Sequence, residues 1–266
     1  MDEPGDREAA IRAAAAKHVV VTLPGMDTLP VRRDVTFRSA AGRALLLDVY
    51  YPPASTGRRP PAVLLPIAYA DPVSRARAFD PLTSWARLIA ASGIAAVVCG
   101  AEAPADDAPA ALGHLRTDAA ALDIDGDRLG LFATSANAVV ALSTLMRDRR
   151  ARTAALLCGY TMDLPGSTAV ADAARQFGFV DACEGRSADD LPPDVPLLFV
   201  RAGRDACPGL NDSLDAVVSR AVARNLPAWL INHATGAHGF DLDERTPLAR
   251  GIVREVLAFL QLHLGR

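Results

Sequence analysis

Apolar residues along most of the chain follow two alternating patterns. Short, continuous apolar runs typical of buried strands occur at residues 62–66, 94–99, 129–132, 153–158, 196–202 and 228–232. Between them, apolar residues recur at helical spacing in segments 81–92, 108–122, 137–146, 211–224 and 247–264. Strands that alternate with helices are typical of a parallel sheet with helices on both faces. The pattern therefore predicts an α/β fold with a mostly parallel central sheet.

The beginning of the chain has a different pattern. Residues 31–38 and 45–51 have the alternation of strands and are separated by a turn at 40–43, which predicts an antiparallel pair at the edge of the sheet. Residues 1–30 indicate a helical arm that ends in a connection with two prolines. We therefore expect an N-terminal arm over 1–30 and one α/β domain over 31–266.

One connection is longer than a crossover requires. Residues 159–193 separate two predicted strands, and their best helical segment is 167–177. The interval is either a small cap at about 160–193 or an ordinary helix with a loop. The sequence leaves both alternatives open.

Ser135 lies between a predicted strand and a predicted helix, in the sequence ATSAN at 133–137. A serine on such a strained turn is held at the carboxyl edge of the sheet, and the N–H groups at the start of the next helix favour a developing negative charge there. The usual elbow is G-x-S-x-G, and here alanine and Asn137 take the two glycine positions. Taken alone, Ser135 is better explained as a turn or capping residue.

Two other residues complete a pattern with Ser135. Asp205 follows the strand at 196–202, and His238 lies in the loop after the strand at 228–232. The carboxyl ends of parallel strands share one edge of a sheet. A serine becomes a nucleophile when an imidazole takes its proton, and a carboxylate orients that imidazole. The order Ser, Asp, His therefore predicts Ser135 as nucleophile, Asp205 as acid and His238 as base.

Other residues compete for two of these roles. His233 falls directly at a strand end, whereas glycines near His238 on both sides allow its loop a close approach. Asp212 and Asp241 are alternative acids, but Asp212 is expected to begin a helix, where acidic residues are common. We therefore favour His238 and Asp205.

Acyl transfer also needs hydrogen-bond donors for an oxyanion. The Ala136 N–H is the first expected donor. The second should come from the loop after residues 62–66, where this chain has PIAY at 66–69. The backbone N–H of Ala68 or Tyr69 can donate, or the phenol of Tyr69. Loss of a donor costs roughly 2.7–4 kcal/mol of transition-state stabilisation.

Composition limits the remaining classes of function. The 266 residues carry a formal net charge of −3 with scattered cations, which argues against nucleic-acid binding. No apolar run approaches the ~20 residues of a membrane span, and the N-terminus lacks the pattern of a signal peptide. The four cysteines form no C-x-x-C pair. We therefore expect a cytoplasmic protein with no membrane partner, no metal and no cofactor.

Three segments carry a resemblance to a known family. They are the acid loop RAGRDACPGLN at 201–211, the histidine loop GAHGFD at 236–241, and DGDRLGL at 125–131 before the elbow. From about residue 31 onward the chain resembles α/β hydrolases of the dienelactone-hydrolase and small-esterase type. The resemblance implies an α/β-hydrolase catalytic domain with Ser135, Asp205 and His238 as its triad. Asn137 and the absence of a His-Gly pair before Tyr69 depart from the family pattern. Dienelactone hydrolases proper use a cysteine nucleophile, so their particular activity is not implied.

These observations predict a serine hydrolase that cleaves a small carboxylic ester or lactone through an acyl-enzyme. One rival is an acyltransferase or other recruited activity on the same triad. The other rival, a non-catalytic binding protein with a hydrolase fold, is motivated by the altered elbow and oxyanion loop. The sequence determines neither the acyl and alcohol specificity nor the oligomeric state, and a homodimer is among the open alternatives.

Overall fold

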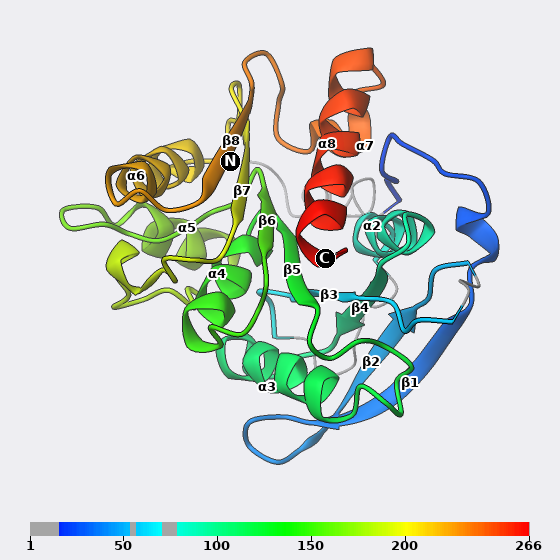
Figure 1. Ribbon diagram of the computed structural model, residues 1–266. Helices are drawn as coiled ribbons and strands as arrows, with labels where there is room; N and C mark the ends of the chain where they lie inside the picture. The colour runs from blue at the N-terminus through cyan, green and yellow to red at the C-terminus, as the bar shows by residue number, and fades with distance from the viewer. Residues whose placement is uncertain (1–15, 54–56, 71–78, 266) are drawn as a thin grey trace, which may run out of the picture.

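The fold is built on one sheet. The structure, a computed structural model, describes residues 16–53, 57–70 and 79–265. Within these residues an eight-stranded sheet has the order β1-β2-β4-β3-β5-β6-β7-β8 (Figure 1). Its strands are β1 (Val31–Arg38), β2 (Ala44–Tyr50), β3 (Ala62–Leu65), β4 (Ala95–Cys99), β5 (Leu129–Thr134), β6 (Ala154–Leu157), β7 (Leu197–Ala202) and β8 (Ala228–His233). The β1–β2 and β2–β4 pairs are antiparallel and the other pairs are parallel. The predicted mostly parallel sheet with antiparallel edge strands is confirmed.

Helices cover both faces of this sheet. They are α2 (Asp80–Ala91), α3 (Pro104–Thr117), α4 (Asn137–Arg147), α5 (Ala169–Phe177), α6 (Leu210–Ala223), α7 (Phe240–Asp243) and α8 (Pro247–Leu264), with short 3-10 helices at Met26–Thr28 and Ala188–Asp190. Figure 1 shows α3, α4 and α6 on one face and α2 and α8 on the other. Each face has its own buried apolar cluster. The predicted three-layer arrangement is therefore also confirmed.

The central strands are buried on both faces. In β5, Leu131 and Ala133 belong to the cluster beneath α3, α4 and α6. Phe132, between them, packs on the ring of Trp85 on the other face, with ring centroids 4.4 Å apart. Successive side chains of a strand point to opposite faces, so a strand covered on both sides needs a continuous apolar run. Each large side chain buried in this way contributes about 1.5–3 kcal/mol to stability.

The helix predicted at 108–122 begins and ends earlier than expected, as α3 at Pro104–Thr117. Pro109, expected in the first turn, therefore lies inside the helix. A proline there removes one helical N–H and leaves the carbonyl four residues earlier without its partner. That carbonyl belongs to Ala105, and the Arg147 Nη1 of the neighbouring helix donates to it at 2.9 Å. A contact between helices thus compensates for the proline, which local sequence could not reveal.

The N-terminal arm is described from residue 16 onward. The described part has no α-helix, and most of the helix predicted for the arm falls in residues 1–15, outside the described residues. The Val19 N–H donates to Ser84 Oγ at 3.1 Å, and the Val20 N–H donates to the Asp241 carbonyl at 2.8 Å. This segment therefore joins α2 to α7.

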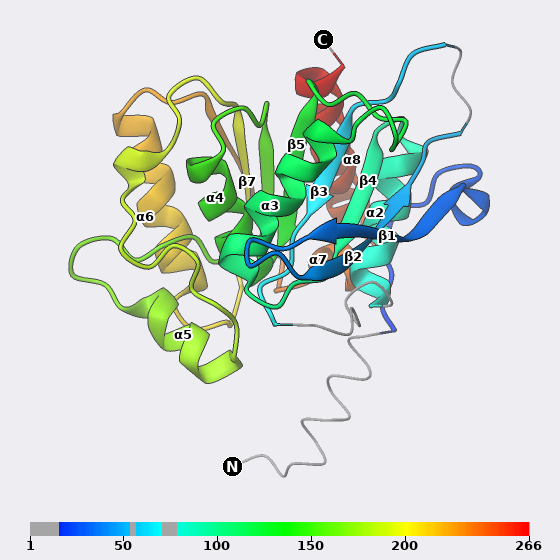
Figure 2. The ribbon, with the colours of Figure 1, turned by 90° about the horizontal axis from the view of Figure 1, so that it is seen from below.

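The long interval at 159–193 contains α5 and a 3-10 helix. Figure 2 shows α5 beside α6, and Tyr160, Val170 and Phe179 are buried in the cluster of the α4 face. The interval therefore consists of one α-helix, one 3-10 helix and loops that pack on the α4 face. Phe179, two residues after the end of α5, reaches the loop after β3, where its ring lies 6.5 Å from that of Tyr69.

Candidate active site

Ser135 occupies the turn between β5 and α4. Its φ is 54°, in the left-handed region that a side chain normally avoids. Its N–H donates to the Leu157 carbonyl at 3.1 Å, which ties the turn to β6. The turn is also crowded, because a Cβ on Gly159 would lie 2.2 Å from the Ala138 Cβ. Strain of this kind persists where surrounding packing enforces it, and it is the geometry of a nucleophile elbow.

The structure brings Ser135, His238 and Asp205 together at the carboxyl edge of the sheet. Ser135 Oγ lies 3.0 Å from His238 Nε2, and His238 Nδ1 lies 2.7 Å from Asp205 Oδ2. The three residues follow β5, β8 and β7 respectively, in keeping with the shared edge of parallel strands. Both contacts are within hydrogen-bonding distance.

The two loops that carry Asp205 and His238 are joined by backbone hydrogen bonds. The Gly203 N–H donates to the His233 carbonyl at 2.8 Å, and the Arg204 N–H donates to the Gly236 carbonyl at 2.8 Å. A Cβ on Gly203 would lie 2.3 Å from the Ala234 carbonyl oxygen. Only glycine therefore lets the loops approach this closely.

Burial and charge oppose each other at the imidazole and the carboxylate. The Asp205 side chain is fully buried, whereas 31% of the His238 side chain remains exposed. Burial disfavours protonated His238, but hydrogen bonding and charge from Asp205 and Cys207 outweigh it and raise the pKa of the imidazole. Burial also opposes ionisation of Asp205, yet the bonds from His238 and Cys207 hold the pKa of that carboxyl below its usual range. The pair thus stabilises an imidazolium beside a carboxylate.

The competing residues lie elsewhere. His233 is buried, and its Nε2 lies 3.0 Å from Glu244 Oε2. Asp241 is buried and accepts a hydrogen bond from Trp85 Nε1 at 2.7 Å. Asp212 is exposed in the first turn of α6. His233 forms no hydrogen bond with Ser135, and neither Asp212 nor Asp241 forms one with His238, whose described partners are Ser135 and Asp205.

The three candidate oxyanion donors have different surroundings. Ala136 directly precedes α4, and no described residue accepts a hydrogen bond from its N–H. The Ala68 N–H donates to Asn137 Oδ1 at 2.8 Å. Tyr69 is 42% exposed. The bond between Ala68 and Asn137 was not foreseen from sequence, although both segments stood out as departures from the family pattern.

Comparisons with known proteins bear on the fold. No protein-family model and no curated protein matches the chain. An esterase from Pseudomonas putida has 17% identity and a TM-score of 0.75, covering 99% of this chain and 91% of that chain. An α/β-hydrolase mutant, LAE6, from the metagenome of Lake Arreo in Spain has 18% identity and a TM-score of 0.71, covering 100% and 91%. The esterase Est22 has 14% identity and a TM-score of 0.71, covering 97% and 87%.

The chain has the α/β-hydrolase fold. Within this fold the elbow after β5 and the loops after β7 and β8 form one rim, on which Ser135, Asp205 and His238 lie. No helix in the described part of this hydrolase fold is both long enough and apolar enough to cross a membrane.

Cys207 adds a thiol to the rim of this hydrolase fold. Its N–H donates to Asp205 Oδ1 at 2.9 Å, and its thiol lies close to the Asp205 carboxylate and the His238 imidazole. Ligand atoms of these three residues lie within 4.8 Å of one another, so they could hold a thiophilic cation. Such a cation would compete with the bond between His238 and Asp205. The only sequence signal for the proximity of these three residues was that Cys207 follows Asp205 by two positions.

Aromatic side chains border the same side of the rim. The Tyr160 and Phe179 rings lie 5.2 Å apart, and Tyr69 meets Phe179 edge-on. Burial raises the pKa of both tyrosines, and a Cys207 charge would raise each further. The Tyr160 hydroxyl donates to the Pro208 carbonyl at 2.9 Å, next to Cys207. These contacts place an aromatic cluster beside the loop that carries Asp205, and of its three rings only that of Tyr69 is exposed.

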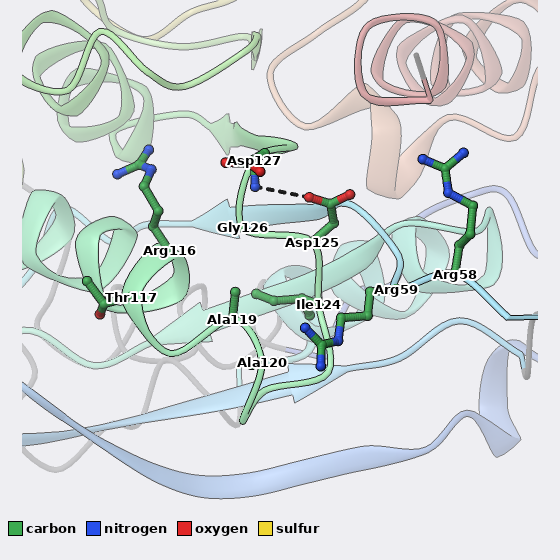
Figure 3. A pocket seen from close by; sticks show the side chains of 10 residues that line it. All are labelled: Arg58, Arg59, Arg116, Thr117, Ala119, Ala120, Ile124, Asp125, Gly126 and Asp127. Atoms are coloured by element: carbon green, nitrogen blue, oxygen red, sulfur yellow. Dashed lines mark hydrogen bonds between the residues drawn. The ribbon is translucent and has the colours of Figure 1, made fainter.

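A cavity of about 500 Å³ lies at the opposite edge of the sheet (Figure 3). Its lining residues precede β3 and β5, whereas Ser135 follows β5. Arg116 on its wall pairs with Asp148 at 2.7 Å, and Asp125 and Asp127 line the cavity beside the arginines (Figure 3). Its charges are mixed and it lies away from Ser135, so we assign it no part in the chemistry.

Proposed function

We propose that the protein is a serine hydrolase that cleaves a small carboxylic ester or lactone through an acyl-enzyme. The observation that carries this proposal is the chain of contacts from Ser135 Oγ to His238 Nε2 at 3.0 Å and from His238 Nδ1 to Asp205 Oδ2 at 2.7 Å. The likeness to solved esterases supports it.

In the first half of the reaction, Ser135 Oγ attacks the carbonyl carbon of the substrate. His238 Nε2 accepts the hydroxyl proton, while its Nδ1–H donates to Asp205, which selects the tautomer with a free Nε2 lone pair. The imidazolium then gives the proton to the departing alcohol oxygen, and an acyl-Ser135 ester remains.

Water completes the cycle. His238 removes a proton from the water, whose oxygen attacks the acyl-Ser135 carbonyl, and the proton returns to Ser135 Oγ as the acid leaves. The carboxylate of Asp205 does not take up a proton but stabilises the imidazolium in both halves. N–H donors near Ala136 stabilise the oxyanion of each tetrahedral intermediate.

The aromatic surface suggests the kind of ester. The exposed ring of Tyr69 packs on the buried ring of Phe179, which in turn packs on Tyr160, and it offers an apolar wall near the Asp205 loop. Burying an apolar substituent against such a wall releases about 25 cal/mol for each Å² of apolar area. We therefore propose a substrate with a small apolar acyl or alcohol group.

The proposal is tested by labelling the purified protein with a fluorophosphonate and locating the adduct by peptide mass spectrometry. The adduct is expected on Ser135 and is expected to be lost in His238→Ala, because the hydroxyl is unreactive without a base. His18→Ala is the matched control, since His18 is an exposed histidine that lies near Asp80 and is distant in sequence from Ser135.

Unlabelled protein from the same preparation is then offered a panel of esters and lactones, with competing alcohols and amines as acceptors. Hydrolysis as the main outcome supports the proposal, and a dominant transfer product supports the transferase alternative instead. Absence of adduct on Ser135 in a folded protein contradicts the proposal and favours a binding protein.

A further inference from the structure

Two departures from the family pattern are in contact with each other. Asn137 stands where the elbow normally has its second glycine, and Ala68 stands in a loop without the usual His-Gly pair. In the structure, Asn137 Oδ1 accepts the N–H of Ala68 at 2.8 Å. A glycine at position 137 could not provide this oxygen. The two departures therefore form one structural feature.

This contact leaves Ala68 unsuitable as an oxyanion donor. Ala68 has no exposed surface, its N–H is bonded to Asn137, and its carbonyl accepts the Val180 N–H at 2.8 Å. If the Ala68 N–H bound a substrate oxygen, it would have to give up its hydrogen bond to Asn137. The Asn137 oxygen would then lose its donor, and that loss would offset the gain from binding the substrate. Ala68 is held on both sides as an anchor for its loop.

The next residue has different surroundings. Tyr69 is 42% exposed, and no described residue accepts a hydrogen bond from its N–H. The Ala136 N–H, directly after the serine, also has no acceptor among the described residues. Tyr69 directly follows Ala68 in the sequence, and Ala136 directly precedes Asn137.

We infer that Asn137 is a positioning residue, which anchors the β3 loop through Ala68 so that the Tyr69 N–H, together with the Ala136 N–H, binds the oxyanion. This inference rests on the proposed function and specifies its donors. It also gives the phenol of Tyr69 no part in binding the oxyanion.

The first test compares Asn137→Ala with wild type on an ester that the wild type turns over. Loss of the anchor should misplace a donor, and kcat is expected to fall by about 10- to 100-fold, with KM changing by less than about 3-fold. Affinity for a boronic acid that mimics the tetrahedral intermediate should fall in parallel with kcat, whereas affinity for the product carboxylate should not. Asn232→Ala, at an exposed asparagine of β8, is the matched control.

The second test removes the proposed donor directly. Tyr69→Pro lacks the backbone N–H, so kcat should fall further than in Tyr69→Ala, which also lacks the ring but keeps the N–H. Since Asn137 is inferred to act through the N–H of Tyr69, Asn137→Ala should add little to the loss in Tyr69→Pro. The Tyr69 variants also decide the matter if Asn137→Ala does not fold.

Three results would overturn the inference. They are an unchanged or increased kcat in Asn137→Ala, losses that multiply in the double variant, and equal losses in Tyr69→Pro and Tyr69→Ala. An increase in Asn137→Ala would mean that the side chain blocks a donor that the substrate needs. If the wild type itself neither takes the fluorophosphonate nor turns over an ester, the proposed function fails, and this inference with it.

Discussion

Gly203 offers the sharpest perturbation of the candidate site that leaves all three of its polar residues in place. It lies between β7 and Asp205, where its loop meets the loop that leads to His238. In Gly203→Ala the new Cβ would lie 2.3 Å from the Ala234 carbonyl oxygen and 2.7 Å from the carbonyl carbon. Contacts below 3.0 Å essentially never occur for a real Cβ. Both neighbouring atoms belong to the backbone, so no side-chain rotation relieves the clash.

The two loops must therefore separate, and the expected displacement is on the order of 1 Å, which costs roughly 100-fold in kcat when it misaligns reacting groups. This movement should lengthen above all the 2.7 Å hydrogen bond between His238 Nδ1 and Asp205 Oδ2, because the two residues lie on the two loops. Overpacking is also expected to lower the free energy of unfolding by about 1–3 kcal/mol.

The assay measures kcat on an activated aryl ester and the free energy of unfolding in urea. Gly251→Ala is the matched control, because Gly251 lies inside α8 and a Cβ there meets nothing within 4 Å. Removal of a glycine from a helix interior should raise its stability by about 0.5–1 kcal/mol without lowering kcat. A folded Gly203→Ala protein with the kcat of wild type would refute the argument that this close approach aligns the two loops.

Three further predictions concern titratable groups. Asp205→Asn is expected to lower kcat about 10⁴-fold. Because the carboxylate raises the pKa of His238, the acidic limb of the profile of kcat/KM against pH should also move to lower pH in this variant. An acidic limb that does not move would contradict this expectation. Burial raises the pKa of Asp241, so its ionisation costs folded-state stability as pH rises above the unfolded pKa; Asp241→Asn, which keeps an acceptor for Trp85, should therefore increase the free energy of unfolding more at alkaline than at mildly acidic pH, and a gain independent of pH would count against it. Zn²⁺ is expected to inhibit ester turnover by binding Asp205, Cys207 and His238; a chelator should restore activity, and equal inhibition of Cys207→Ala would rule out that ligand set.

Local sequence patterns were enough to predict the layered fold. The runs at 62–66, 94–99 and 129–132 lack alternation because their strands are covered on both faces, and the helices between them repeat every 3–4 residues. Both periods follow from the backbone geometry of a single element. The carboxyl ends of parallel strands share an edge, so the same reasoning selected Ser135, Asp205 and His238 as neighbours, and their catalytic roles remain a prediction.

Contacts between distant segments were beyond such reasoning. Arg147 completes the hydrogen bonding around Pro109 from another helix, and so the position of α3 was misjudged. Asn137 and Ala68 are 69 residues apart and bond only because β3 and β5 are neighbours in the sheet.

The sequence by itself thus determined the order of elements, the two-sided burial of the central strands and the residues that share the carboxyl edge. Those properties depend on periodicity along one segment. Only the tertiary structure decided that Ala68 is anchored by Asn137 and that the thiol of Cys207 lies close to His238 and Asp205. Which N–H remains free and which side chains meet depend on how separate loops pack, and packing arises from the whole chain at once.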